Sequence, residues 1–337
     1  MPVGTQAAVK GVSPAELAAT GTRMFITNTY HLWLRPGAEL IAELGGLHRF
    51  MQWPHAIATD SGGFQAFSLA TRVKLTEEGF HFASHLDGSR HLLSPEEAMN
   101  VQGLLGSDIA LQLDVCPPAG VGRSQLVDAV ERTTRWAERC LLSRRGKQAL
   151  FGIIQGGVDV ELRLQHAERL SQLPLDGLAL GGFSVGEPNE RMHETLRAVV
   201  PAVDTRRVRY LMGVGTPADL VRAIGVGVDL FDCVIPTRNA RNGQCFTSSG
   251  KLMIRNAKYR ADSRPIDPAC DCPACAGGFS RAYLRHLYVA SEILAHRLLS
   301  LHNLHFYARL VAQARAAIQE GRYADWSQRW LAGWGVG

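Results

Sequence analysis

The stretch "LFGIIQGGVDVELRLQHAERLSQLPLDGLALGGFSVGE", Leu150–Glu187, contains one complete strand–helix–strand unit. Two short apolar runs end in small residues, and a helical segment over 159–172 separates them. Asp159 stands where the first turn of that helix needs a cap. A helix between two strands allows the strands to pair in parallel, which is typical of α/β proteins.

The same alternation recurs along most of the chain. Strand-like runs end in small or polar residues and cover 24–31, 56–63, 108–116, 150–157, 177–187, 209–216 and 228–236. Helical segments lie between several of them, at 94–106, 124–145, 159–172, 188–200 and 217–226. Seven such units and a less distinct eighth predict a (β/α)₈ TIM barrel, with a doubly wound open sheet as the alternative.

Polar residues gather where these strands end. The strand ends carry Asn28, Asp60, Asp114, Gln155, Gly181–Gly182, Met212–Gly213 and Asp232. In a parallel barrel the carboxyl ends of all strands open on one face, where enzymes of this fold place their active sites. The pattern therefore predicts a catalytic pocket on that face.

Two segments depart from the alternation. Residues 79–93 predict a hairpin that turns at Asp87-Gly88, and residues 243–256 predict another that turns at Ser249-Gly250. We expect one catalytic barrel domain over 1–337 with a subdomain inserted at about 257–305.

Composition and charge narrow the class of protein. With 46% hydrophobic and 20% charged residues among 337, the chain is an ordinary globular one. No apolar run is long enough to span a membrane, and the start has no signal pattern, so we expect a cytoplasmic protein.

The charge is unevenly distributed along the chain, because from Cys233 onward it has 14 Lys and Arg against 6 Asp and Glu. This basic third favours a polyanionic partner such as nucleic acid, although a solvated basic face would give the same count.

The sequence "CDCPAC" places three cysteines, Cys270, Cys272 and Cys275, within six residues. Three thiolates and one imidazole would form a closed tetrahedral zinc site, which is structural because no coordination position stays open. The alternative is a set of reduced structural cysteines. Spacing alone does not choose the fourth ligand among His286, His296, His302 and His305.

Six motifs together carry a family resemblance. They are "DSGGFQ" (60–65), "GIIQGG" (152–157), "GGFSVGE" (181–187), "YLMGVGTP" (210–217), "FDCVIPTRNARNGQ" (231–244) and the Cys/His segment 270–307 that includes "LHNLHFY". They resemble the tRNA-guanine transglycosylases of the bacterial type, in register from Met1 to about Arg315. The resemblance implies replacement of guanine at wobble position 34 of tRNAs with GUN anticodons by the 7-deazaguanine preQ1, in queuosine biosynthesis. It also implies a homodimer, and we take His302 as the fourth zinc ligand.

Through this resemblance the site residues receive roles. Asp232 matches the nucleophile and Asp60 the general acid/base of a double displacement at the ribose, and Asn28 is expected to orient Asp60. We expect the pKa of Asp60 to exceed that of Asp232 because burial beside a second carboxylate favours the protonated form. The residues expected to contact the base are Asp114, Gln155, Gly182, Phe183 and Ser61, and Phe64 and Met212 are expected to cover the two faces of its ring. The residues expected to set the preference for the incoming base are Cys116, Val185 and Glu187. We expect Arg238 and Arg241 to bind the tRNA.

Several readings stay open. A Val at 185 is expected to exclude the bulky base queuine, but a queuine-inserting enzyme of the eukaryotic type is an alternative. A non-catalytic tRNA-binding partner subunit and a zinc-dependent barrel hydrolase are two further alternatives.

Family chains usually have strands ahead of the "MPVGTQAAVK" motif that cap the barrel floor, and we expect them to be missing here. Ile235-Pro236 is expected to turn the chain toward the RNA, and Asp229 has no assigned role.

Overall fold

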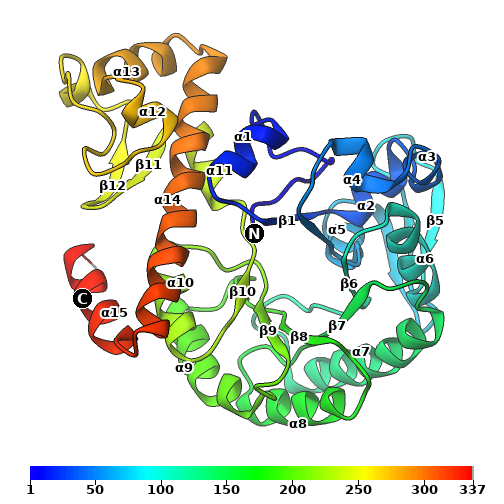
Figure 1. Cartoon of the computed structure of the whole chain (residues 1–337). Helices are drawn as coiled ribbons and strands as arrows, with labels where there is room; N and C mark the ends of the chain where they lie inside the picture. Colours follow the sequence, from blue (N-terminus) through cyan, green and yellow to red (C-terminus); the bar gives the residue numbers. More distant parts are fainter. Residues whose placement is uncertain (336–337) are drawn as a thin grey trace.

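The computed structural model describes residues 1–335, so the last two residues of the expected domain lie outside it. Seven parallel strands form one sheet that curls around a common axis (Figure 1). In hydrogen-bonded order they are β1 (Met24–Thr27), β2 (Ala56–Thr59), β6 (Ile109–Leu111), β7 (Ala149–Ile154), β8 (Gly177–Leu180), β9 (Val208–Leu211) and β10 (Leu230–Phe231). The strands follow the chain order without reversal, so the predicted α/β barrel is confirmed and the doubly wound alternative is wrong.

Residues 2–3 occupy the remaining position of the ring, between β10 and β1. Pro2 pairs in parallel with Cys233, and Val3 pairs in parallel with Ile26. The backbone N–H of Ile26 donates to the Pro2 carbonyl over 3.0 Å, and that of Cys233 donates to the Met1 carbonyl over 3.3 Å. The less distinct eighth unit is therefore a short bridging segment rather than a strand with its own helix.

Helices cover the outside of the sheet, most visibly around its lower edge in Figure 1. The five predicted helices appear as α6 (Pro95–Leu105), α7 (Arg123–Ser143), α8 (Val160–Ser171), α9 (Asn189–Val199) and α10 (Pro217–Gly225). Side-chain caps explain where they begin. Ser94, Asp159 and Thr216 each accept a backbone N–H three residues ahead, over 3.1, 3.0 and 3.2 Å.

A further set of helices and turns is shorter, and three of its members begin within runs that the sequence assigned to strands. They are α1 (Pro14–Ala19), α2 (Thr29–Leu34), α3 (Ala38–Glu43), α4 (Gly46–Met51), α5 (Gly63–Ser68) and α11 (Ile235–Arg241), with the 3₁₀ turns η1 (Val200–Ala202) and η2 (Ala257–Tyr259). Ile235-Pro236 was expected to turn the chain but instead opens α11, because proline suits the first turn of a helix.

Three acidic residues at the bottom of the barrel fix the strand register. Each stands just before its strand and accepts the backbone N–H of a residue on the neighbouring strand. Asp108 accepts from Ile57 over 2.7 Å, Asp176 from Leu150 over 2.8 Å and Asp229 from Arg209 over 2.9 Å. Asp229 thus has a structural role, at the opposite end of β10 from Asp232.

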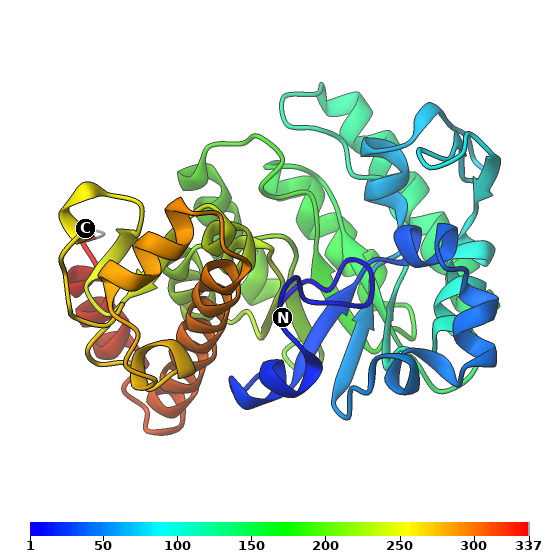
Figure 2. The same ribbon diagram turned by 90° about the horizontal axis from the view of Figure 1, so that it is seen from above.

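The remaining strands and helices lie outside the barrel ring. The hairpin predicted over 79–93 is formed by β4 (Phe80–Ala83) and β5 (Arg90–Leu93), and β3 (Thr71–Leu75) pairs with β4 to complete a three-stranded sheet. The second predicted hairpin is β11 (Gln244–Thr247) with β12 (Gly250–Met253). The helices that follow are α12 (Pro273–Ala276), α13 (Arg281–Val289), α14 (Ile293–Gln319) and α15 (Tyr323–Gly333). Figure 2 shows these later elements grouped at one side of the barrel, with α14 running between them and the ring. Within residues 1–335, no helix combines the length and apolar character needed to cross a bilayer.

Candidate active site and metal centre

A cavity of about 450 Å³ opens where the carboxyl ends of the barrel strands meet. Barrel-interior side chains from six strands lie beneath it: Ile26, Ala58, Leu111, Phe151, Ala179 and Tyr210. The cavity wall gathers nearly all the predicted site residues, namely Asn28, Asp60, Ser61, Phe64, Asp114, Cys116, Gln155, Gly182, Phe183, Val185, Met212, Asp232 and Arg238. Two predicted residues, Glu187 and Arg241, do not line it.

Asp60 sits in a set of hydrogen-bond donors at the end of β2. Its Oδ1 accepts the backbone N–H of Thr29 over 2.9 Å, and its Oδ2 accepts from Gln65 Nε2 over 2.9 Å and from Asn28 Nδ2. These donors favour the carboxylate, but burial acts more strongly and raises the pKa of Asp60 to about 6, with nearby Asp232 adding to the rise. Asp60 can therefore exchange a proton close to neutral pH.

Asp232 follows β10 and is held through one oxygen. Its Oδ1 accepts from the Tyr210 hydroxyl over 2.6 Å and from the backbone N–H of Gly213 over 2.9 Å. Burial and the neighbouring carboxylate raise the pKa of Tyr210 well above its usual value, so the phenol keeps its proton and donates. No hydrogen bond from residues 1–335 reaches Oδ2, which leaves that oxygen available to a substrate.

Asp114 and Gln155 form a hydrogen-bonded pair in the cavity wall. Gln155 Nε2 donates to Asp114 Oδ2 over 2.7 Å. Burial raises the pKa of Asp114 to about 6 despite this bond. Gly182, beside them at the end of β8, has a φ of +68°, and a side chain there would place its Cβ 2.3 Å from Gln155 Oε1. Only glycine fits this position.

The other walls are apolar or weakly polar. Phe64 on α5 is 53% exposed, which leaves its ring free to contact a ligand. Burial raises the pKa of Cys116 to about 12, so its thiol stays protonated and unreactive. The Ser61 hydroxyl makes a local hydrogen bond, in which it accepts the backbone N–H of Gly63 over 3.3 Å. Glu187 lies behind the wall and accepts the backbone N–H groups of Ser184 and Val185, the latter over 3.0 Å.

Helix α11 carries both predicted tRNA-binding arginines, Arg238 and Arg241. Residues three apart share one face of a helix, and Arg238 also lines the cavity. Asn303 of α14 anchors this helix, since its Nδ2 donates to the Pro236 carbonyl over 2.9 Å while its Oδ1 accepts the N–H of Phe246 over 3.0 Å. The adjacent residue, His302, belongs to the cysteine cluster, so one turn of α14 contacts both sites.

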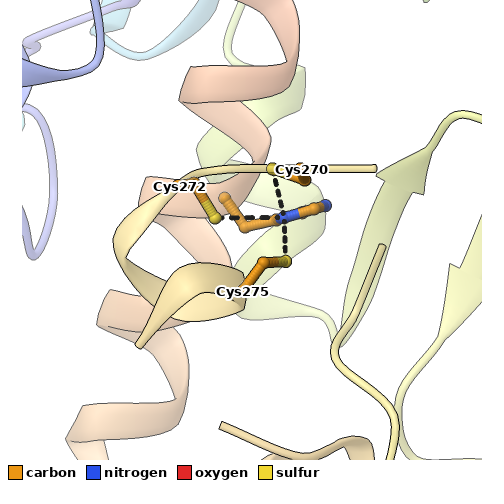
Figure 3. Close-up of side chains that lie close together, drawn as sticks. Cys270, Cys272 and Cys275 are labelled. Atoms are coloured by element: carbon orange, nitrogen blue, oxygen red, sulfur yellow. Dashed lines mark hydrogen bonds between the residues drawn. The ribbon is translucent and has the colours of Figure 1, made fainter. Parts of the chain in front are cut away.

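The four predicted metal ligands converge outside the barrel. Figure 3 shows the thiols of Cys270, Cys272 and Cys275 directed at one point, and their Sγ atoms lie 3.7, 3.4 and 3.4 Å from His302 Nδ1. A tetrahedron with ordinary Zn–S and Zn–N bonds has edges of about 3.6 Å between sulfur and nitrogen. The other ring nitrogen, Nε2, pairs with the Phe246 carbonyl over 2.8 Å, which leaves Nδ1 free to bind a metal. The donor set therefore fits a metal ion.

Comparisons with known proteins show the family of the chain. A family profile described as "Queuine tRNA-ribosyltransferase" matches residues 1–335. The chain belongs to this family. It is 64% identical over 331 residues to a queuine tRNA-ribosyltransferase of Sorangium cellulosum, covering 98% of this chain and 84% of the relative. The corresponding proteins of Solidesulfovibrio magneticus and Listeria innocua are 53% and 51% identical over 328 and 337 residues, covering 96% and 99% of this chain and 87% and 89% of theirs.

Several residues that hold the two carboxylates of this queuine tRNA-ribosyltransferase family member were not predicted from the sequence. Tyr210, Gln65 and Thr29 contact the two catalytic candidates but come from other elements or from the far side of a turn. Tyr210 and Gln65 lie inside the motifs "YLMGVGTP" and "DSGGFQ", so the signal was present without a role attached to it.

Proposed function

We propose that this protein exchanges guanine at the wobble position of tRNAs with GUN anticodons for preQ1, through a covalent bond between Asp232 and the ribose. The observation that carries the proposal is the joint placement of two carboxylates, Asp60 and Asp232, on one cavity that also holds a purine-reading edge. Double displacement needs a nucleophile and a separate proton carrier. The free Oδ2 of Asp232 and the raised pKa of Asp60 suit these two roles.

In the first half of the reaction, Asp232 Oδ2 attacks ribose C1′ and the C1′–N9 bond to guanine breaks. Asp60 gives its proton to the departing purine, which leaves neutral. In the second half, Asp60 takes a proton from N9 of the incoming base, N9 attacks C1′, and the bond from C1′ to Asp232 breaks. Each group returns to its starting state, because one proton and one glycosidic bond are exchanged for the same. Tyr210 and Gly213 hold Asp232 in place throughout.

The purine edge explains recognition of guanine. Ionised Asp114 would accept from N1–H and the exocyclic amine, while Gln155 and the N–H of Gly182 would donate to O6. The Gln155 amide nitrogen has two hydrogens, so one remains after its bond to Asp114. Adenine would leave these buried groups unpaired, which is how such a site rejects it. Phe64 and Met212 would cover the two faces of the ring, with Ser61 and Phe183 completing the pocket.

The choice of incoming base would depend on three wall residues. Val185 and Cys116 line the cavity and restrict its size, which suits the small aminomethyl group of preQ1 rather than queuine. Glu187 lies directly behind Val185 and would provide a negative charge near the amine. Queuine insertion is the alternative that the same wall would have to admit.

The RNA would be held outside the cavity. A target base reaches the pocket only when it flips out of the anticodon loop. Arg238 and Arg241 would bind the nucleotides beside it, since guanidinium groups pair with phosphates and base edges. We further propose zinc at the four-ligand centre, in the subdomain at about 257–305, where it would fix the RNA-binding surface without entering the reaction. A homodimer in the cytoplasm completes the proposal.

Incorporation of labelled guanine into a tRNA with a GUN anticodon tests the exchange. The wild type should incorporate label, and a tRNA whose anticodon lacks G at position 34 should stay unlabelled. Asp232→Ala should form no covalent RNA adduct, whereas Asp229→Asn, altered at the other end of the same strand, should still form one. Absence of incorporation by the wild type, or an adduct in Asp232→Ala, would contradict the proposal.

A further inference from the structure

Helix α8 places two buried polar side chains under the purine-reading edge. Arg163 and His166 are both 0% exposed, and their spacing of three residues puts them on one face of the helix. The proposed chemistry uses neither of them. Burying a polar side chain destabilises the fold unless the side chain makes hydrogen bonds, so the contacts of these two residues indicate their role.

The guanidinium of Arg163 joins the ends of two barrel strands. Its Nη1 donates to the Ile154 carbonyl over 3.2 Å, its Nη2 to the Gly181 carbonyl over 2.8 Å, and its Nε to the Gly157 carbonyl. The ring of Phe183 lies 3.8 Å from the guanidinium carbon. No salt bridge to Arg163 occurs within residues 1–335. Burial lowers the pKa of Arg163 to about 9, so it remains charged at neutral pH. Backbone carbonyls accept its hydrogen bonds, and the negative charge of nearby Glu187 partly opposes the shift.

His166 holds the residue between these contacts. Its Nδ1 accepts the backbone N–H of Gln155 over 2.9 Å. Burial lowers the pKa of His166 to about 4, so the ring stays neutral and Nδ1 keeps its lone pair for this bond. Together the two side chains of α8 fix the backbone on both sides of Gln155 and the peptide that precedes Gly182.

This region tolerates little displacement, because a Cβ at Gly182 would already clash with Gln155 Oε1 at 2.3 Å. We propose that Arg163 and His166 are positioning residues that set the spacing between Gln155 and the Gly181–Gly182 peptide, so that both donate to the carbonyl edge of a purine. The inference rests on the proposed function and adds the residues that preorganise its base specificity.

Arg163→Lys tests whether the planar guanidinium group of Arg163 is needed. Lysine keeps the charge, but one ammonium group cannot reach carbonyls on two strands in the same geometry. Displacement of the donors by about 1 Å should raise the KM for guanine roughly 10- to 100-fold, with the KM for tRNA unchanged. The ratio of the inhibition constants of 2-aminopurine, which lacks the O6 carbonyl, and guanine should fall by a similar factor. Arg169→Lys, on the same helix but 42% exposed and paired with Glu131, is the matched control and should leave all values unchanged.

His166 provides a second pair of variants. His166→Asn can place an oxygen near the former Nδ1 and should keep guanine binding, whereas His166→Leu leaves the Gln155 N–H unpaired and should weaken it at least about tenfold. Thermal melting establishes that each variant is folded. Equal losses for both purines, or an unchanged guanine KM in folded Arg163→Lys and His166→Leu, would overturn the inference. A wild type that exchanges no guanine would instead defeat the proposed function.

Discussion

Replacing Asp114 by asparagine should stabilise the protein while it removes guanine binding. The side chain is 9% exposed, and burial raises its pKa from 3.8 to about 6. Because the folded pKa is the higher one, the folded protein binds this proton more tightly than the unfolded chain. Stability from this group therefore increases as the pH falls through about 6, and the ionised carboxylate destabilises the fold at higher pH.

The size of the effect follows from the shift of about two pKa units. At about 1.4 kcal/mol per unit, the carboxyl group destabilises the fold by about 3 kcal/mol at about pH 7.5, where it is ionised in both states. At about pH 5 it is mostly protonated in the folded protein but mostly ionised in the unfolded chain, and the cost falls to about 1.5 kcal/mol. Asparagine has the same shape, stays neutral, and keeps an oxygen to accept from Gln155 Nε2. Asp114→Asn should thus gain stability by up to these amounts, with the gain at about pH 5 roughly half of that at about pH 7.5.

Urea unfolding followed by tryptophan fluorescence at the two pH values measures the difference. Asp325→Asn is the control, because Asp325 is exposed on α15 and its change should stay within about 0.5 kcal/mol. Equal or lower stability of Asp114→Asn at the higher pH, or a gain that grows on acidification, would refute the reasoning. Either result would mean that the carboxylate is better solvated than its position in the cavity implies.

Three further outcomes are expected. Guanine binding to the free protein, measured by calorimetry, should weaken about tenfold per pH unit below about 6 as Asp114 takes up its proton, and a flat profile would argue against its role as an acceptor. Val185→Gly should admit queuine in a competition assay, whereas a wild type that already accepts queuine would disprove the steric assignment. Removal of metal by a chelator should weaken tRNA binding at least about tenfold, reversibly on adding zinc, and leave guanine binding intact, because His302 adjoins the residue that anchors α11. Unchanged tRNA affinity without metal would show that the metal centre does not support the tRNA-binding arginines of α11.

Patterns of local origin were readable in the sequence. Alternating strand and helix periods gave the parallel barrel, capping residues such as Ser94 and Asp159 gave the helix starts, and polar residues after apolar runs marked the open face. "CDCPAC" predicts a metal site because ligands a few residues apart meet through local chain geometry alone. Short helices such as α2 and α11 were missed, since fewer than two turns give no clear periodicity.

Tertiary structure decided what depends on residues far apart in the chain. It brought His302, which spacing alone did not choose and the family resemblance predicted, to the three cysteines. It also paired Tyr210 with Asp232 and brought Arg163 to the carbonyl of Gly181. It also explained Asp229, whose partner Arg209 lies on the neighbouring strand. The proton affinities of Asp60 and Asp114 belong to this second group, because burial sets them, and burial exists only once the strands have assembled around the cavity. The sequence by itself therefore determined which chemical groups are present and on which strand ends, whereas only the folded barrel decided their distances and their charges.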